Sequence, residues 1–322
     1  MKIEGSFYQP FERVNKTSTQ LDWDRDHWKQ ELNWMKEVGM DLLIIQFCVY
    51  EGRAYYPTTL YPQAGHNDQV ENILSEAEKI GMKVMVGLTL DNQWWKGINS
   101  EEYIQQELAM NKKLAKDLWD KYGHYKSFWG WYIPHEIDDW GAEPENVRQL
   151  ISKLLGELSA SLKELTPGKP IGIAPYYSMR MTPEAYENWW IKTLESSGID
   201  IVMLQDGVGC HRPDMEKEIT PYFQALASAC RKTNVHFWTD LEIFNQIHCH
   251  PVDDWPVEKW DAIPADMGRI ARQIELQEPW VEKIVIFEFT HYMSPQMGEN
   301  EKTLYKDYKN YLINKGELQK SM

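Results

Sequence analysis

The feature that most constrains the fold of this chain is a regular alternation of short apolar runs with longer amphipathic stretches. Eight apolar, β-branched or aromatic runs begin at residues 3, 41, 83, 128, 169, 200, 235 and 283. Several are apolar at consecutive positions, which is typical of strands buried on both faces. The stretches between them carry helix signals: those at 22–39 and 67–81 begin near an Asp and end at a Gly.

Eight strand–helix units in a row predict one α/β domain, a single (β/α)8 TIM barrel that spans residues 1–322. No Pro- or Ser-rich linker and no shift of composition divides the chain. A doubly wound open sheet is the structural rival. That rival is disfavoured because no GxGxxG motif or phosphate-binding loop follows any of the runs.

The charge and the cysteines exclude several classes of function. A formal net charge of -15 argues against a nucleic-acid partner, since proteins that bind phosphate backbones carry basic patches. The four cysteines form no CxxC pair, and we expect no cofactor and no metal. The segment His248-Cys249-His250 is the one short cluster of metal-ligand types, and we interpret it as a loop.

No apolar run approaches the roughly 18 residues of a membrane span, so we expect no membrane-spanning segment. The first ten residues, MKIEGSFYQP, also lack the apolar core of an export signal. The chain is therefore either cytoplasmic or an exported protein whose signal is absent from this sequence. The sequence leaves the localisation open between these two.

Aromatic residues are unusually frequent, with 15 tryptophans and 17 tyrosines, and many stand at the ends of the predicted strands. The carboxyl ends of barrel strands form the mouth at which TIM-barrel enzymes bind their substrates. Candidate site residues at these ends are Gln9, Gln46, Asp91, Trp94, Trp95, His135, Glu136, Tyr176, Tyr177, Gln205, Asp206, Glu242 and Glu288. A mouth of carboxylates, amides and aromatic rings suits a neutral carbohydrate, because the polar groups bind hydroxyls while the rings stack on sugar faces.

Two of these residues have the chemistry of glycoside cleavage. Glu136 closes the fourth predicted strand and Glu242 closes the seventh, at roughly opposite places on the rim. Hydrolysis of a glycosidic bond needs a protonated carboxylic acid at the leaving oxygen and a second carboxylate at the anomeric carbon. Glu136 follows the apolar run FWGWYI, which is expected to raise its pKa and keep it protonated. Glu242 is expected to be the ionised partner.

The chain resembles a known family at several places: GSFYQPF near the start, KVMVGLTLDNQWW and FWGWYIPHEID. These phrases are similar to those of a bacterial family of glycosidase-like proteins that is catalogued as a domain of unknown function, number 4434. The two glutamates also resemble the large clan of retaining (β/α)8 glycosidases, in which the strand-four residue is the acid/base and the strand-seven residue the nucleophile. The resemblance implies these roles for Glu136 and Glu242. The clan usually has Asn before its acid/base glutamate, and here that position is His135.

Two other functions fit the same residues. The first is a carbohydrate-binding barrel without catalysis, which keeps the aromatic rim but lacks a carboxylate pair at working distance. The second is a metal-dependent sugar isomerase or deacetylase that uses Glu136, Asp206, His211 and Glu242 at the rim.

Overall fold

The eight predicted strands close into one parallel barrel. In the computed structural model, which describes residues 1–10, 21–210, 214–247 and 262–319, the barrel order is β1-β13-β10-β9-β8-β7-β5-β2. Its strands are β1 (Ile3–Tyr8), β2 (Leu42–Ile45), β5 (Lys83–Gly87), β7 (Phe128–Ile133), β8 (Ile171–Ile173), β9 (Ile201–Gln205), β10 (His236–Glu242) and β13 (Lys283–Phe287). The prediction of a single TIM barrel is confirmed, and each strand begins within two residues of its predicted start.

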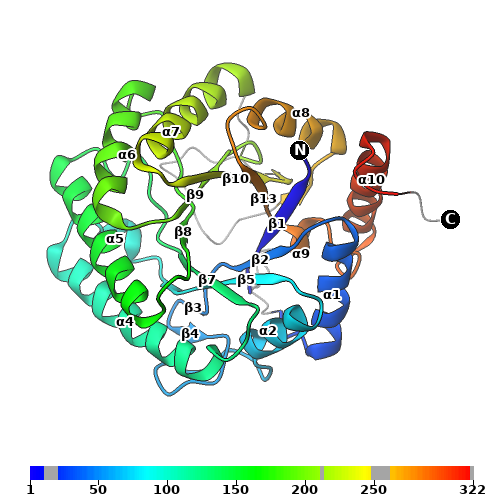
Figure 1. Ribbon diagram of the computed structural model, residues 1–322, viewed down its shortest axis with the longest axis horizontal. Helices are drawn as coiled ribbons and strands as arrows, with labels where there is room; N and C mark the ends of the chain where they lie inside the picture. The colour runs from blue at the N-terminus through cyan, green and yellow to red at the C-terminus, as the bar shows by residue number, and fades with distance from the viewer. Residues whose placement is uncertain (11–20, 211–213, 248–261, 320–322) are drawn as a thin grey trace.

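Helices form a ring around the barrel, as Figure 1 shows in a view along the barrel from the side of the N-terminus. The long helices are α1 (Arg25–Glu37), α2 (Gln69–Lys79), α4 (Glu101–Tyr122), α5 (Glu145–Leu165), α6 (Pro183–Ser197), α7 (Thr220–Thr233), α8 (Met267–Gln277) and α10 (Glu299–Lys315). The predicted start signals are in use: the side chains of Asp24 and Asp68 accept hydrogen bonds from the first turns of α1 and α2. Gly39 and Gly81, which follow these two helices, have φ of 85° and 65°, so both adopt the left-handed conformation that glycine favours.

Shorter elements decorate the ring and the mouth. They are β3 (Val49–Tyr50), β4 (Arg53–Ala54), β6 (Thr89–Leu90), β11 (Phe244–Gln246), β12 (Ala262–Pro264), α3 (Trp94–Gly97), α9 (Phe289–Tyr292) and a single π-helical turn at Met215–Ile219. β3, β4 and β6 form a small sheet, and β11 pairs with β12. These elements follow the carboxyl ends of β2, β5 and β10, so they extend the barrel beyond its mouth.

Two apolar layers explain why the strand runs are apolar on both faces. The barrel interior is filled by a cluster that includes Phe7, Met85, Tyr132, Met203 and Trp238. A second and larger cluster joins the outer faces of the strands to the helices. Because successive side chains of a strand alternate between these layers, membership of the inner cluster shows which positions face the barrel axis.

One glycine is required by the close approach of neighbouring strands at the mouth. A Cβ atom at Gly87, the last residue of β5, would lie 2.3 Å from the carbonyl oxygens of both Ile45 and Gln46. No side chain fits there without moving the end of β2. The glycine therefore lets the carboxyl ends of β2 and β5 approach each other.

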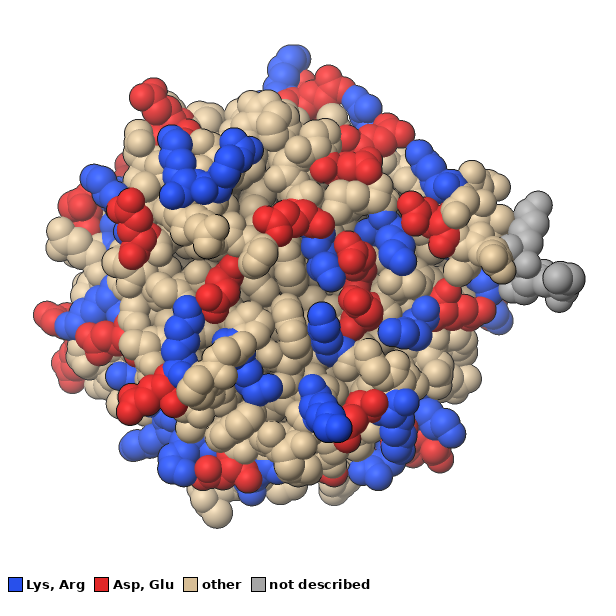
Figure 2. Space-filling model, viewed as in Figure 1, with Lys and Arg blue, Asp and Glu red and all other residues tan. Residues whose placement is uncertain are grey.

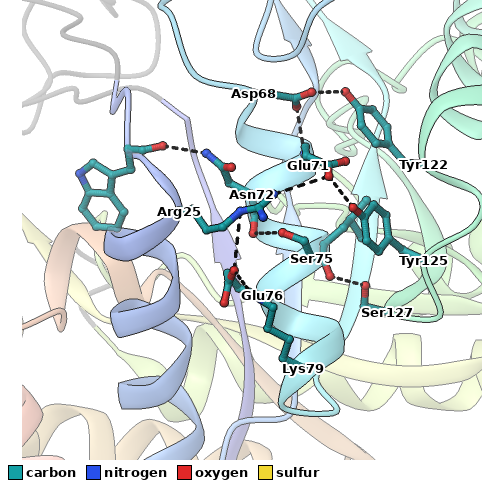
Figure 3. A network of polar contacts seen from close by, with 12 residues as sticks. Arg25, Asp68, Glu71, Asn72, Ser75, Glu76, Lys79, Tyr122, Tyr125 and Ser127 are labelled. Atoms are coloured by element: carbon teal, nitrogen blue, oxygen red, sulfur yellow. Dashed lines mark hydrogen bonds and ion pairs between the residues drawn. The ribbon is translucent and has the colours of Figure 1, made fainter.

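A polar network ties the helix layer together beside β5 and β7 (Figure 3). Asp68 at the start of α2 accepts a hydrogen bond of 2.7 Å from Tyr122 Oη, and Glu71 accepts one from Tyr125 Oη. Arg25 of α1 lies 3.6 Å from Glu71 and 3.7 Å from Glu76. The network thus joins α1, α2 and the end of α4, three neighbouring parts of the helix ring. Of the helices in the described part of the chain, none is long and apolar enough to cross a membrane.

Candidate active site

The last strand positions of β10 bring two carboxyl groups toward the barrel axis. Trp238 belongs to the interior cluster, and side chains alternate along a strand, so Asp240 and Glu242 lie on the same inner side. Asp240 pairs in register with Gln205 of β9 and with Val285 of β13. Both acids are buried, with 3% of Asp240 and 6% of Glu242 exposed. The mouth therefore begins with two acids in an almost dry environment.

Asp240 is the centre of a larger group of carboxylates. Burial raises its pKa well above the ordinary value, and the negative charges of Glu242, Asp206, Glu136 and Glu288 raise it further. These four acids stand at the ends of β7, β9, β10 and β13, so the fold brings acids from four strands close to Asp240. Asp240 Oδ1 has no hydrogen-bond partner among the described residues. Burial among other negative charges favours the protonated form of a carboxyl group.

Glu242 has a defined set of contacts. Its Oε2 accepts a hydrogen bond of 3.3 Å from the backbone N–H of Cys210 and approaches Gly209, where a Cβ atom would lie 2.8 Å from it. Its backbone carbonyl accepts hydrogen bonds of 2.9 Å from Arg269 and 3.1 Å from Gln273, both on α8. The β9–α7 loop and α8 together therefore fix Glu242 in place.

The protonation of Glu242 differs from the expectation. Burial, and next the charge of Asp206, raise the pKa of Glu242 to about 8, whereas the charge of Arg269 and the backbone donors oppose the rise. This direction favours the protonated form and runs against the expectation of an ionised Glu242, because a carboxyl group buried beside other acids is ionised only at a cost.

Glu136 lies just beyond β7, half-buried, on a support made by its neighbours. Trp94 Nε1 donates a hydrogen bond of 2.6 Å to the backbone carbonyl of Glu136. The ring of His135 contacts that of Trp94 edge-on at 4.7 Å, and its Nε2 lies 3.0 Å from Glu107 Oε2 on α4. Trp94 and His135 are 0% and 1% exposed. Both therefore position Glu136 from below, and neither is placed to touch a sugar as the sequence had suggested.

The two aspartates that follow Glu136 hold the loops of the mouth together. Asp138 accepts hydrogen bonds of 2.7 Å from the Gly141 N–H and 2.6 Å from Ser178 Oγ. Asp139 accepts hydrogen bonds from the backbone N–H groups of Ser178 and Met181, the latter at 2.7 Å. Both aspartates are buried. They join the loop after β7 to the loop after β8 and so fix the rim beside Glu136.

On the other side of the mouth, Glu288 connects three elements. Its Oε2 accepts a hydrogen bond of 2.8 Å from the backbone N–H of Gln9, and its Oε1 contacts His291 Nδ1. Gln9 Nε2 donates to Gln46 Oε1 at 3.1 Å, which joins the ends of β1 and β2. Glu288 and Gln9 are 1% and 3% exposed, whereas Gln46 is half-buried. Gln46 is therefore the member of this group that is open to the mouth.

The two predicted residues at the end of β9 differ in their exposure. Asp206 is 0% exposed and accepts four hydrogen bonds, from the N–H groups of Val208 and Glu242 at 3.1 and 3.2 Å and from two glutamine side chains of α8 at 2.7 Å each. It therefore braces β10 against α8, and the expected direct contact with a substrate is not open to it. Gln205 is half-buried and donates to the Ala174 carbonyl at 2.8 Å.

The aromatic candidates also separate by depth. Tyr177 is fully buried and donates a hydrogen bond of 3.0 Å to the Asp206 carbonyl, so its expected contact with a substrate is replaced by a structural one. Tyr176 is half-buried and stacks on Tyr177 at 5.5 Å. Trp95 is 44% exposed, and Asp91, half-buried, accepts a hydrogen bond of 2.7 Å from the Gln93 N–H. Trp95, Tyr176 and Asp91 remain candidates for contact with a ligand.

Three residues that matter here received no role from the sequence. Asp240 was expected at the end of the seventh strand, and the alternation of β10 puts it on the same face as Glu242. Arg269 and Glu107 come from helices, and no local signal in the sequence pairs them with the mouth.

Among the described residues no group of three or more His, Cys, Asp and Glu side chains is arranged to hold a metal ion. His211 and the segment 248–250, named above in connection with metals, lie outside the described residues.

The chain matches a family model and several known proteins. The model of the family described as "Domain of unknown function (DUF4434)" matches residues 3–299. The "Uncharacterized protein YbcH" of Escherichia coli K12 is 26% identical over 234 residues, which are 70% of this chain and 71% of that protein.

Two solved structures from Bacteroides thetaiotaomicron have similar folds. A "putative alpha-L-fucosidase" is 24% identical at a TM-score of 0.78, with 97% of this chain and 93% of that one covered. A GH99 endo-alpha-mannosidase is 13% identical at 0.57, with 97% and 96% covered. These likenesses show a shared barrel fold.

Proposed function

This chain belongs to the DUF4434 family, and we propose that it is a glycoside hydrolase that cleaves a neutral oligo- or polysaccharide. The observation that carries the proposal is that acids from four strand ends, Glu136 and Glu242 among them, act on the buried Asp240 of β10. Glycoside cleavage is a reaction that uses two carboxyl groups across one site. The barrel that the chain shares with several glycoside hydrolases supports the same reaction class.

We assign the roles by position. Glu136, half-buried and held by Trp94, donates a proton to the glycosidic oxygen as the bond to the anomeric carbon breaks. Glu242 attacks that carbon and forms a glycosyl ester, and the leaving sugar departs as an alcohol. Glu136 then removes a proton from water, whose oxygen attacks the same carbon and releases the sugar and the free Glu242 carboxylate. The result is retention of the anomeric configuration.

This assignment requires Glu242 to lose its proton before the attack. Because its pKa is raised to about 8, only a minority of ligand-free molecules carry the ionised form at neutral pH. The positive charge of Arg269 favours that form. Turnover should therefore increase with pH toward about 8.

The lining of the mouth favours a neutral ligand. Its accessible groups are the carboxylates Glu136 and Asp91, the amides Gln46 and Gln205, and the exposed indole of Trp95. Such groups accept and donate hydrogen bonds to hydroxyls, whereas an anionic substrate would be repelled by the acids. The test substrates are fucosides, mannosides and galactosides, because solved structures with a similar barrel are named as a putative alpha-L-fucosidase, an endo-alpha-mannosidase and, from Marinomonas ef1, a beta-galactosidase.

The test is the activity of matched variants on aryl glycosides and on oligosaccharides of these sugars. We expect Glu136→Gln and Glu242→Gln to lose about three orders of magnitude or more in kcat, because each removes a group that acts in the transition state. The control is Glu164→Gln, which changes an exposed glutamate on α5 far from the mouth. Full activity in either mouth variant would remove that residue from the mechanism.

A second candidate function is carbohydrate binding without catalysis. The observation in its favour is the burial of Glu242, of which 6% is exposed, since a nucleophile must reach the anomeric carbon. The same panel distinguishes the two. Saturable binding of a sugar at the mouth, with no release of product by the wild-type protein, would select the binding function.

A further inference from the structure

The barrel has a cavity at the end opposite to the mouth. It measures about 810 Å³ and is lined by residues at or near the beginnings of β7, β8, β9, β10 and β13, which include Trp129, Lys169, Asp200, His236, Trp238 and Lys283. This volume is in the range of about 300–1,000 Å³ that is common for small-molecule sites. The cavity is separated from Glu136 and Glu242 by the packed interior of the barrel. A ligand bound here would therefore be independent of the proposed hydrolysis.

Two tryptophans form the inner wall of this cavity. The indole planes of Trp129 and Trp238 are 7° from parallel and their centroids are 6.4 Å apart. Trp129 is half-buried, so part of its surface is open to solvent. Lys83 lies 4.9 Å above the ring of Trp129 and Lys283 lies 5.3 Å above the ring of Trp238. These lysines hold the two rings in one orientation from the sides of β5 and β13.

The indole N–H groups of this pair are available to a ligand. Within the part of the chain that the structure describes, neither Trp129 nor Trp238 donates a hydrogen bond from Nε1 to a protein acceptor, and neither atom is among the buried polar atoms that lack a partner. Neither Nε1 atom is therefore fully enclosed, although Trp238 as a whole is only 6% exposed. Indoles that only closed the base of the barrel would have no need of open donors, whereas a stacked ring with a free N–H suits a ligand with both an apolar face and hydroxyl groups.

Most charged side chains around the cavity have partners of opposite charge, which favours a neutral ligand. Lys163 is 3.0 Å from Asp200, His236 is 2.6 Å from Glu282, and Lys283 is 3.3 Å from Glu4. Figure 2, which shows this face of the molecule, has basic and acidic side chains interspersed with no large area of one sign. Such pairs offer both donors and acceptors at fixed positions without a strong field. An anion would gain little from Lys163 and Lys283, which already have acidic partners, and Lys169 Nζ donates a hydrogen bond to the Phe128 carbonyl.

From these observations we propose that the cavity at the base of the barrel is a second carbohydrate-binding site, which takes a neutral sugar against Trp129 and Trp238. The apolar face of the sugar lies on the indoles. Its hydroxyl groups bind Asp200, His236 and the two indole N–H groups. A site at this end would bind one part of a glycan chain without competing with the mouth.

The test uses fluorine NMR of protein labelled with 5-fluorotryptophan, in the Glu242→Gln background so that no sugar is consumed. Each of the 15 tryptophans reports its own surroundings, and the Trp129→Phe and Trp238→Phe variants identify the two resonances of interest. The probes are fucose, mannose, galactose and the N-acetylglucosamine dimer, with sodium phosphate and sodium benzoate as anions. We expect saturable shifts of both resonances with at least one sugar and none with the anions.

His236→Ala, which lies outside the barrel interior, keeps the test valid if a tryptophan variant folds poorly. It removes an exposed polar contact of the cavity and should weaken sugar binding several-fold. Trp129→Ala, if it folds, should weaken binding about tenfold. Trp140→Ala is the matched control, because Trp140 is 43% exposed in the loop after β7 at the other end of the barrel, and it should leave the affinity unchanged.

Three results would overturn the proposal: no shift at Trp129 and Trp238 with any of the four sugars, shifts with the anions alone, or equal affinity in His236→Ala and wild type. Each leaves the hydrolase proposal standing, because that proposal is judged by product release at the mouth. Conversely, if the wild-type protein hydrolyses no glycoside, the resonances of Trp129 and Trp238 still test the second site, because they report sugar binding and not catalysis.

Discussion

Replacing Glu242 by glutamine should stabilise the protein, and the gain should grow with pH. Glutamine keeps the shape of the side chain but carries no charge, so it removes the cost of ionising a carboxyl group that is 6% exposed beside Asp206. Residues that serve a reaction often destabilise the fold in this way. A stabilising substitution that abolishes activity would therefore support a catalytic role for Glu242.

The magnitude follows from the raised pKa. In the folded protein the pKa of Glu242 is about 8, against 4.5 in the unfolded chain. Below about pH 4.5 both states hold the proton, so the group costs nothing. Between about pH 4.5 and about 8 the unfolded chain releases the proton while the folded protein keeps it, which favours unfolding increasingly as the pH rises. The full difference corresponds to about 5 kcal/mol of unfolding free energy above about pH 8.

The assay is thermal unfolding of wild type and Glu242→Gln between about pH 5 and about pH 9, within the window that the shifted pKa defines. With an unfolding entropy of about 2.1 cal/mol/K per residue, a difference of about 5 kcal/mol over 322 residues is roughly 7 °C in Tm. Glu164→Gln, an exposed change on α5, should follow wild type at every pH. A Tm difference that is constant across the range, or larger at acid pH, would refute the reasoning.

The remaining predictions concern the support of the mouth. In Arg269→Met the charge that lowers the pKa of Glu242 is lost, so the rise of kcat/KM with pH should move to higher pH by about one unit or more, as a pH–rate profile would show; an unmoved profile would exclude the coupling. Gly87→Ala places a Cβ atom 2.3 Å from the carbonyl oxygens of Ile45 and Gln46, and chemical denaturation should show a loss of about 1–3 kcal/mol in the free energy of unfolding. Unchanged stability of Gly87→Ala would contradict the tight approach of β2 and β5.

The fold could be predicted from the sequence because its signals are local and repeat. Consecutive apolar residues, as in the run from residue 83, are set by burial of a strand on both faces, and the Asp and Gly residues at helix ends act within one turn. The start of each strand was therefore found within two residues. Closure of the barrel followed from the number of units and from the absence of a break between them.

The candidate site was predicted less completely, because the exposure of a side chain at a strand end depends on helices that are distant in the sequence. The sequence placed Asp206 beside Gln205 and gave both the same role. In the structure Gln273 and Gln277 of α8, which are far along the chain, bind the Asp206 carboxylate and keep it from the mouth. His135 is similar, since its partner Glu107 comes from α4. No local pattern connects these pairs.

For the same reason, the sequence could not show which of the two glutamates, Glu136 or Glu242, has the higher pKa. For Glu136 the expectation of a raised pKa rested on the aromatic run that precedes it. For Glu242 the causes are burial and the charge of Asp206, and these depend on packing that only the folded barrel creates. Asp240, two residues before Glu242, was expected at the end of the same strand, and the alternation of the strand alone puts both side chains on one face.

The central proposal is that Glu242 attacks the anomeric carbon while Glu136 serves as acid and base. The most direct measurement is covalent trapping with activated 2-deoxy-2-fluoro and 5-fluoro glycosides of fucose, mannose and galactose, followed by mass spectrometry of the digested protein. The proposal predicts an added sugar on the peptide that contains Glu242, and none in Glu242→Gln. A sugar ester on Glu136 or Glu288, or hydrolysis with inversion and no trapped intermediate, would contradict it.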